Sequence, residues 1–504
     1  MTRSPVIEID ELTAAQGHRV LAGKDCALAD AMADAKAALA RGEEATWRVA
    51  VGLHSVYAIE SVHRLAADAG INVQFDALAS LQGPERVFFD DYVRYRLPIS
   101  RGERAARFAD EWTSAGGEAL SALLGLVRPG GARAPEPERL NSVVIIGAYG
   151  GDHIGDAAIL GGTLLGLHKR YGITRATVMS GRPDHTRKLA DGLSTPVKID
   201  VAPYRAAAVK RALDKADALV LGGGPLYGSP RILARHLAAT SSARRRGLPF
   251  IVERIGMAHF GSALTRWAGR HILEGAARTS VRTTASAKHP LMEGLTVEVG
   301  RDPAFDYLEE RGALDRLSPS DGEAVDALLE GTEGSLKVGI NMRPTLDQWR
   351  DLSDLSRDTV DPAFIGKLAE GLIAFAQANK RPVTFVFFPM NAIQLGMSDL
   401  SAAYELHRAV RGAVDFRVWE ADASLDGVVH LLRRLDAAIA MRFHASIFAV
   451  SQNLPLIGLD YFAGSGGKVS ELLSDLGRPD DASTVGRFTS EWLVDRLKLA
   501  TRAS

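Results

Sequence analysis

Short apolar runs that alternate with amphipathic stretches restrict the fold of this chain more than any other feature of its sequence. From Val143 onward, the runs VVIIG, ATVMSG, ALVLGGG and PFIVERIG have the length and composition of buried strands. Helical patterns such as DAAILGGTLLGLHKRY and RAAAVKRALDKA lie between them. This order of elements predicts a parallel sheet with helices on both faces.

The same alternation begins again after a polar, helix-rich stretch at residues 308–334. Its strands are predicted at VGINMRP, VTFVFFP, VDFRVWE, AAIAM and LPLIGLD. We therefore predict an α/β protein with two Rossmann-like lobes, residues 139–334 and 335–504, and a cleft between them. Ligands of open parallel sheets bind outside the carboxyl ends of the strands, so the functional residues are expected there.

Residues 1–138 follow a different pattern. ALADAMADAKAALARG predicts a helix from its alanine content, and WRVAVGLH, SVYAIESVHRLAADAG and INVQFDAL predict a small βαβ unit. GERAARFADEWTSAGGEALSALLGLV is a further helical pattern, and RPGGARAPEPER has the composition of a linker. We assign these residues to a separate accessory domain, α/β or helical.

The composition indicates a soluble, cytoplasmic protein. Its 60 basic and 61 acidic residues balance, so nothing in the charge calls for a nucleic acid as partner. The single cysteine, Cys26, excludes an internal disulfide and a cysteine-based zinc site. The N-terminus lacks the pattern of a signal peptide, and no apolar run has the length of a transmembrane helix. Peripheral contact with a membrane remains compatible with this composition.

Two glycine-rich segments follow predicted strands of the first lobe. GAYGGDHIGDAAIL, residues 147–160, opens a helix, and DALVLGGGPLYG, residues 217–228, ends a strand. Glycines let a backbone turn tightly and approach a ligand, and a helix N-terminus offers N–H groups to an anion. Each segment fits an ordinary tight connection equally well, but two of them in one lobe suggest a shared pocket floor. Neither carries a dinucleotide fingerprint or a P-loop.

Arg343 ends the first predicted strand of the second lobe and is followed by a proline. An arginine fixed at a strand end is suited to holding a carboxylate or phosphate through two hydrogen bonds. A surface salt bridge explains the same pattern equally well.

Arg442 and His444 stand where an apolar strand gives way to an apolar helix. The strand would carry Arg442 to its carboxyl end, and His444 would lie in the first turn of the helix, where N–H groups favour the neutral imidazole. Such an imidazole can exchange protons near neutral pH, and the arginine beside it can hold an anion. The alternative is a structural pair in which Arg442 binds Asp436 or Asp460. Lys468, after the next strand, adds a third cation to the same edge.

Two other patterns give little indication of a functional site. RILARHLAATSSARRRG, residues 231–247, predicts a helix that ends in a basic, solvated turn. Contact with an anionic acceptor is the less favoured interpretation of that turn. The thirteen histidines show no spacing typical of metal ligands, so no metal site is predicted.

The order of these motifs resembles the polysaccharide pyruvyl transferase family over about two thirds of the chain. No single motif is specific, but the ordered set is. It consists of the G-x-x-G and G-D-x-A-I features of residues 147–160, the G-G-G strand end, R-D-P-A-F at 301–305, Arg343, R-x-H at 442–444 and P-L-I-G-L-D-Y…K-V ending at Val469.

The resemblance implies a fold similar to the two-lobed glycosyltransferase-B enzymes and a reaction that needs no cofactor. Members of the family move a pyruvyl group from phosphoenolpyruvate to two hydroxyls of a sugar, forming a cyclic ketal. The resemblance also implies that His444 is the catalytic acid and base and that Arg343 and Arg442 hold the donor. We add Lys468 to the donor site on the basis of its position.

One departure from the family concerns the first lobe. The family's first motif usually reads N-x-G-D, and His153 stands here in place of the asparagine. This bears on the acceptor, a saccharide or a lipid-linked saccharide, more than on the donor. The residues that we expect near the acceptor are Gly151, His153, Asp156, Gly223 and Gly224.

Two other functions fit the sequence. A glycosyltransferase or sugar-nucleotide enzyme of the same architecture would need a ribose ligand, for which Asp460 and Glu420 are the candidates. A binding or assembly subunit that has lost the chemistry is the third alternative, against which the presence of Arg343, Arg442 and His444 argues. The identity of the acceptor, and the choice between a ketal and an open enolpyruvyl ether, stay open.

Overall fold

The computed structural model describes residues 6–9, 26–53, 55–96, 133–149, 154–310, 317–344, 362–392, 398–420, 423–461 and 467–502. Contacts within the chain divide it into two compact units. One unit joins Met1–Pro98 to Leu314–Ser504, and the other is Ile99–Ala313.

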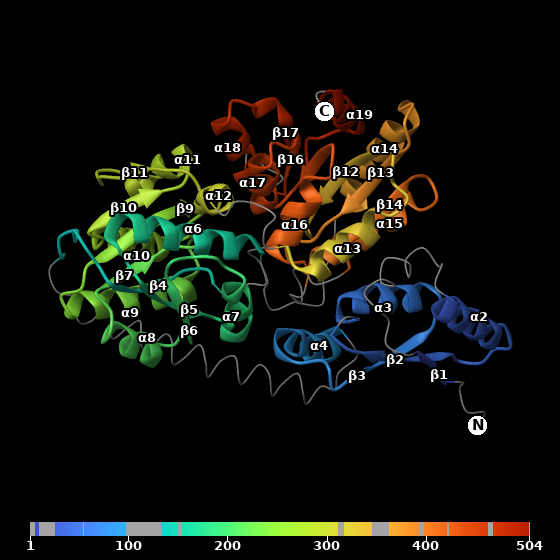
Figure 1. The fold of residues 1–504 in the computed structure, drawn as a ribbon, viewed down its shortest axis with the longest axis horizontal. Coiled ribbons are helices and arrows are strands. Elements are labelled where there is room, and N and C mark those ends of the chain that lie inside the picture. The colour runs from blue at the N-terminus through green and yellow to red at the C-terminus, as the bar shows by residue number, and fades with distance from the viewer. Residues whose placement is uncertain are drawn as a thin grey trace. The chain divides into compact units, whose positions relative to one another are not determined.

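The first lobe, drawn mainly in green in Figure 1, is built on one parallel sheet. Its strands run in the order β11-β10-β9-β7-β4-β5-β6, and the short β8 pairs with β9. Numbered along the chain, this is the order of a Rossmann fold extended by one edge strand. The strands are β4 Ser142–Ile146, β5 Arg175–Ser180, β6 Lys198–Pro203, β7 Ala218–Leu221, β8 Pro225–Leu226, β9 Phe250–Met257, β10 Arg278–Val281 and β11 Glu298–Val299.

Helices follow most of these strands and bury their apolar faces in two clusters that include alternate residues of β4. They are α6 Ile154–Tyr171, α7 Pro183–Asp191, α8 Ala206–Leu213, α9 Pro230–Arg245, α10 Ala263–Glu274, α11 Thr284–Ala287, η2 Pro290–Met292 and α12 Pro303–Glu310. The R-D-P-A-F segment begins α12, where Asp302 forms a buried ion pair with Arg282 at 2.8 Å. That segment therefore has a structural role within this lobe.

The second lobe repeats the same plan. Its parallel sheet has the order β14-β13-β12-β15-β16-β17, which is again the Rossmann order. The strands are β12 Leu336–Asn341, β13 Val383–Phe387, β14 Asp415–Val418, β15 Ala437–Ala440, β16 Leu456–Asp460 and β17 Ala482–Thr484. The prediction of two Rossmann-like lobes is confirmed.

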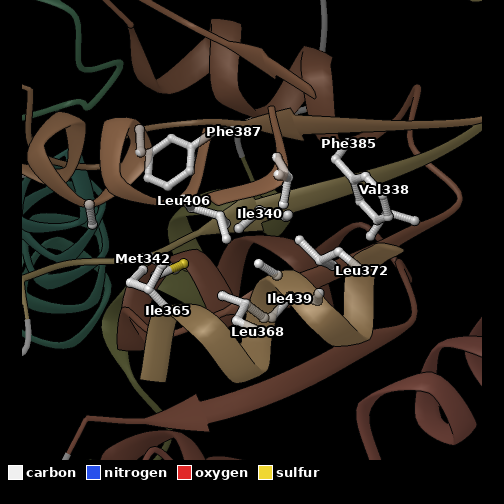
Figure 2. Close-up of a cluster of buried hydrophobic side chains, with 14 of the residues drawn as sticks. Val338, Ile340, Met342, Ile365, Leu368, Leu372, Phe385, Phe387, Leu406 and Ile439 are labelled. Carbon is white, nitrogen blue, oxygen red and sulfur yellow. The ribbon is translucent and has the colours of Figure 1, made fainter. Parts of the chain in front are cut away.

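One face of this second sheet packs against helix α14. Figure 2 shows Ile365, Leu368 and Leu372 of that helix against Val338 and Ile340 of β12. Each of these side chains is nearly or fully buried, and burying a residue of this size stabilises the fold by about 1.5–3 kcal/mol. The helices of this lobe are α13 Pro319–Leu329, α14 Pro362–Ala378, α15 Asp399–Val410, α16 Leu425–Leu432, α17 Phe443–Ser451, α18 Lys468–Asp475, η4 Pro479–Asp481 and α19 Ser490–Arg502.

The N-terminal residues form a small α/β layer around a parallel sheet of order β1-β2-β3. The predicted helix and βαβ unit are both present, and Trp47 lies at the centre of the core with no exposed surface. The elements are β1 Val6–Ile9, α2 Cys26–Ala40, β2 Thr46–Val51, η1 Val56–Ala58, α3 Ile59–Asp68, β3 Asn72–Ala77 and α4 Gly83–Arg96.

This N-terminal layer shares a unit with the second lobe. Arg64 on α3 forms ion pairs with Glu60 of its own helix and with Glu405 on α15. The contacts also group α13 with the second lobe, because it packs on α16. The division into domains 1–138, 139–334 and 335–504 stays a prediction, as does the cleft.

Every strand predicted from an apolar run of the two lobes is present. The strands that the sequence did not indicate are β6, β10 and β17 with the two-residue β8 and β11, together with β1. They are short or lie towards the sheet edges. Strands β6 and β17 are only partly buried, and β10 is buried but has the polar sequence RTSV, so none of these three carries a continuous apolar run. The helix predicted at residues 102–127 lies outside the described residues. None of the described helices is long and apolar enough to cross a membrane.

Candidate functional site

Two of the predicted cations stand where the strand order of the second lobe reverses. Strands β13 and β14 lie on one side of β12, and β15 to β17 lie on the other. Asn341 at the end of β12 pairs in register with Ala440 at the end of β15. Arg343 and Arg442 each lie two residues beyond this pair, so they leave the sheet at the same edge. In open α/β sheets this reversal is the place where ligands bind.

Arg442 is held by a carboxylate that the sequence did not point to. Its Nε lies 2.6 and 2.8 Å from the two oxygens of Asp399, and its Nη2 lies 2.5 Å from Oδ1. Both side chains are buried. The expected structural partners Asp436 and Asp460 were therefore wrong: Asp436 accepts the N–H of Lys337, and Asp460 binds the start of α18.

Asp399 also ties together the ends of three strands. Besides Arg442, it accepts hydrogen bonds from Nδ2 of Asn341 at 3.3 Å and from the N–H groups of Met390 and Asn391 at 2.9 and 3.3 Å. Oδ1 of Asn341 in turn accepts the N–H of Arg442 at 3.2 Å. A buried carboxylate satisfied in this way positions the guanidinium and offsets part of the cost of burying it.

Arg343 is not a surface residue, because only 7% of it is exposed. Its guanidinium carbon lies 4.8 Å from the centre of the Tyr461 ring, which is cation–π geometry. Burial, and next the positive charge of Arg442, lowers the pKa of Arg343 to about 10. The group stays protonated at neutral pH, and a bound anion would relieve the repulsion between the two guanidinium groups.

His444 lies where the sequence predicts, as the second residue of α17. Arg442 is the N-cap of that helix, and the imidazole is buried against the edge of the Phe443 ring. The strand therefore fixes Arg442, and the first helical turn fixes His444 beside it. The catalytic role of His444 stays a prediction.

Lys468 is the first residue of α18 and is half-buried. Asp460, the last residue of β16, accepts the N–H groups of Gly467, Val469 and Ser470 at 2.9 to 3.1 Å. This carboxylate anchors the start of α18 to the sheet edge. Arg343, Arg442 and Lys468 thus follow three neighbouring strands, β12, β15 and β16.

The first lobe brings its two glycine-rich segments together at its own strand reversal, between β4 and β7. A Cβ on Gly147 would lie 1.8 Å from the carbonyl oxygen of Gly222, so only glycine allows this approach. Gly223 has a φ of 73°, and a Cβ there would lie 2.3 Å from the hydroxyl of Tyr149. Glycine is thus required for the contact between the two strand ends.

The predicted acceptor residues of the first lobe are only partly described. Gly223 and its neighbour Gly224 lie at the end of β7, and Asp156 lies in the first turn of α6. Gly151 and His153 lie outside the described residues. Proximity to an acceptor stays a prediction for all five.

A cavity of about 210 Å³ opens at this reversal, entirely within the first lobe. Its floor is the glycine-rich strand ends, and its walls include Tyr149, Tyr204, Tyr227, Arg235 and His236. Oη of Tyr204 lies 2.8 Å from Nδ1 of His236. Burial, and next the charge of Arg235, lowers the pKa of His236 to about 4, so its imidazole is neutral at physiological pH.

The residues that sequence reasoning missed are Asp399 and Tyr461 in the second lobe and Tyr204 and His236 in the first. Tyr461 directly follows the strand that ends at Asp460, so its position after a predicted strand was an available signal. His236 lies on α9, the arginine-rich helix. From the sequence, only the basic turn at the C-terminal end of this helix was interpreted.

Among the described residues, no group of histidine, cysteine and carboxylate side chains has the geometry of a metal site. The two ribose candidates of the nucleotide alternative are engaged elsewhere. Asp460 is fully buried and binds the start of α18, and Glu420 is buried and accepts a hydrogen bond from Tyr404.

A family model described as polysaccharide pyruvyl transferase matches residues 153–461, more than half of the chain. No curated protein gave a significant match. Solved structures with similarity include a putative UDP-N-acetylglucosamine 2-epimerase from Listeria monocytogenes, with 12% identity, 72% of this chain and 88% of that chain covered, and a TM-score of 0.47.

The UDP-GlcNAc 2-epimerase from Neisseria meningitidis has 12% identity, with 71% of this chain and 90% of that chain covered and a TM-score of 0.46. The E. coli ADP-heptose lps heptosyltransferase II has 14% identity, with 72% and 99% covered and a TM-score of 0.40. With TM-scores below 0.5, these similarities carry no argument about function.

Proposed function

Because the chain belongs to the polysaccharide pyruvyl transferase family, we propose that it moves a pyruvyl group from phosphoenolpyruvate to two hydroxyls of a saccharide. The product is a cyclic ketal, and phosphate is released. Family membership makes the protein a transferase, and the donor and the ketal are the part that we propose.

The observation that carries this proposal is the pair of buried arginines at the strand reversal of the second lobe. Phosphoenolpyruvate bears a carboxylate and a phosphate, and such groups are held by guanidinium groups that bind through two hydrogen bonds. Arg442 is fixed by Asp399, and Arg343 is fixed against Tyr461. We assign Arg343 and Arg442 to the two anionic groups of the donor, with Lys468 near them on the neighbouring helix.

His444 is the candidate acid and base. In the first step a hydroxyl of the sugar attacks C2 of phosphoenolpyruvate and gives up its proton, while the methylene carbon C3 gains one. The C2–O bond to phosphate then breaks, and the second hydroxyl attacks C2 and loses its proton as the ring closes. A histidine beside Arg442 can accept a hydroxyl proton and return one to C3 or to the leaving phosphate.

The first test is a calorimetric titration with phosphoenolpyruvate, which needs no acceptor. The variants are Arg343→Gln and, as a control, Arg433→Gln, which removes the same charge from an exposed arginine of the same lobe. Because loss of one partner of a buried charge pair costs about 2 kcal/mol or more, we expect binding to Arg343→Gln to be at least about thirtyfold weaker.

Unchanged affinity in Arg343→Gln would contradict the donor assignment. The parallel titration with a uridine-diphosphate sugar separates the alternatives. Binding of the nucleotide sugar without binding of phosphoenolpyruvate would favour the glycosyltransferase function.

The role of His444 is tested by phosphate release from phosphoenolpyruvate in the presence of a panel of oligosaccharides. His444→Asn is expected to lose about 10²–10⁴-fold in rate while still binding the donor, because it removes proton transfer alone. A rate equal to that of the wild type would contradict the assignment. Donor binding by the wild type with no phosphate release for any saccharide would favour the silent binding subunit.

A further inference from the structure

The cavity of the first lobe has the composition of a site for a neutral, hydroxyl-rich ring. Tyr149, Tyr204 and Tyr227 contribute aromatic walls, and the peptide groups of Gly222 to Gly224 form part of the lining. The guanidinium carbon of Arg235 lies 5.9 Å from the centre of the Tyr204 ring. Aromatic side chains combined with a few placed polar groups are the usual lining of small-molecule sites.

His236 supplies the polar group on which this inference depends. The residue is only 3% exposed and lines the cavity. Its Nδ1 is occupied by Tyr204, whereas its Nε2 makes no hydrogen bond with any described residue. A ligand hydroxyl in the cavity can bond to this second ring nitrogen.

The Tyr204–His236 pair can serve a hydroxyl in either direction. If Tyr204 donates to Nδ1, then Nε2 carries the hydrogen and donates to the ligand; in the other tautomer Nε2 accepts. A sugar hydroxyl is both donor and acceptor, so it matches both states. Tyr204 stays a phenol because burial raises its pKa.

Size and charge narrow the class of ligand. At about 210 Å³ the cavity is smaller than the roughly 300–1,000 Å³ of sites that hold drug-sized ligands, so it suits a single ring rather than a nucleotide sugar. The low pKa of His236 keeps that side chain uncharged, so Arg235 is the cation among the lining residues, in contrast with the paired guanidinium groups of the second lobe.

We propose that this cavity binds one pyranose ring of the saccharide acceptor, with the Tyr204–His236 pair hydrogen bonded to a hydroxyl of that ring. The naming of the ligand as acceptor rests on the proposed function. The choice of a sugar ring as the ligand rests on the residues of the first lobe alone.

The experiment is saturation-transfer NMR on the full chain with five probes. These are the methyl pyranosides of galactose, glucose, mannose, N-acetylglucosamine and N-acetylmannosamine. We expect at least one to bind, and we expect His236→Leu to weaken that binding about tenfold, since it removes the hydrogen bond to the ligand. His271→Leu, the same substitution at a half-buried histidine on α10 of this lobe, is the control and leaves binding unchanged.

Two further variants keep the test valid if His236→Leu folds poorly. Ile232→Trp fills the cavity from α9 and should abolish binding, and Tyr204→Phe should weaken it. Failure of all five glycosides to bind the wild type overturns the proposal. Binding that survives Ile232→Trp and Tyr204→Phe also overturns it, as does competition by uridine diphosphate that depends on the same residues.

Titration of the same preparations with phosphoenolpyruvate separates this inference from the proposed function. A glycoside that binds through His236, in a protein that never binds phosphoenolpyruvate, would support the sugar site and contradict the proposal that phosphoenolpyruvate is the donor. If phosphoenolpyruvate binds and no glycoside does, the donor proposal is supported and the proposed sugar site is contradicted.

Discussion

The two lobes share one strand order and differ in what stands at its reversal. In the second lobe the chain leaves β12 and β15 with Arg343 and Arg442, and a buried carboxylate fixes one of them. In the first lobe it leaves β4 and β7 with glycines, and a tyrosine–histidine pair lines the cavity. In our proposals both ligands therefore bind at a strand reversal, and the side chains around each reversal distinguish an anionic ligand from a sugar ring.

The largest expected effect comes from removing the carboxylate of the second lobe. Asp399→Ala leaves the guanidinium of Arg442 buried without its partner, which typically costs about 3–5 kcal/mol, and we expect phosphoenolpyruvate binding to be lost. Urea denaturation and calorimetry measure the two effects. Asp217→Ala is the control, since this first-lobe carboxylate accepts two backbone N–H groups near the surface and should cost less. Equal destabilisation by both variants would contradict the inference that Asp399 compensates the buried charge of Arg442.

The next effect concerns pH and Glu420, at the end of β14. Burial raises the pKa of Glu420 to about 8, although hydrogen bonds from Tyr404 and Ser61 act in the opposite direction. The folded state thus keeps a proton that the unfolded state loses above about pH 4.5, so stability falls as the pH rises towards 8. The loss is on the order of a few kcal/mol, and Glu420→Gln should abolish it.

Hydrogen exchange measured from pH 5 to 9 shows which of the two compact units loses stability as the pH rises. Peptides of the second lobe and the N-terminal layer should lose protection towards high pH in the wild type alone. A wild-type profile as flat as that of Glu420→Gln would contradict the raised pKa.

The first lobe is expected to respond to pH with the opposite sign. The pKa of His236 is lowered to about 4, so the unfolded state binds a proton below about pH 6.5 that the folded state refuses. Stability should therefore fall as the pH drops from 6.5 to 4, by roughly 3 kcal/mol at most. Exchange protection of α9 peptides measures this, and His236→Gln should remove the dependence. Acid loss of protection that persists in this variant would assign it to another group.

The smallest expected effect is that of Tyr149→Phe in the first lobe, which is compared with Arg442→Met in the second. The hydroxyl of Tyr149 is buried and makes no hydrogen bond with any described residue. Tyr149→Phe should thus leave the free energy of unfolding unchanged or raise it by less than about 1 kcal/mol. Arg442→Met, at the strand reversal of the second lobe, leaves Asp399 buried without its ion-pair partner and should destabilise strongly. If the free energy of unfolding of Tyr149→Phe is lower by several kcal/mol, the hydroxyl of Tyr149 makes a stabilising interaction and the prediction is wrong.

The sequence predicted the framework because the fully buried central strands carry unbroken apolar runs. Strands such as β7 and β15 have no exposed residue, and their composition alone identifies them. Arg343, Arg442 and His444 could be placed because each directly follows such a strand. Edge strands such as β6 were missed, since their alternating burial leaves no such run.

Residues far apart in the chain were beyond this reasoning. Asp399 lies 43 positions from Arg442, at the start of a helix, where an acidic residue normally needs no further explanation. The pairing of Tyr204 with His236 depends on how α9 packs against α8 and β7, which no local pattern encodes. Sequence therefore indicated where a ligand could bind, whereas the groups that orient the candidate binding residues could be identified only from the structure.

Asp399 also limits how a chain of this kind can diverge. Because its carboxylate binds Asn341, Met390, Asn391 and Arg442 at once, it fixes the guanidinium relative to the ends of three strands. A relative that kept Arg442 and His444 but lost the carboxylate at position 399 would retain every recognisable motif and yet present a misplaced cation. Classification of such chains as active should therefore include position 399 alongside the motif residues.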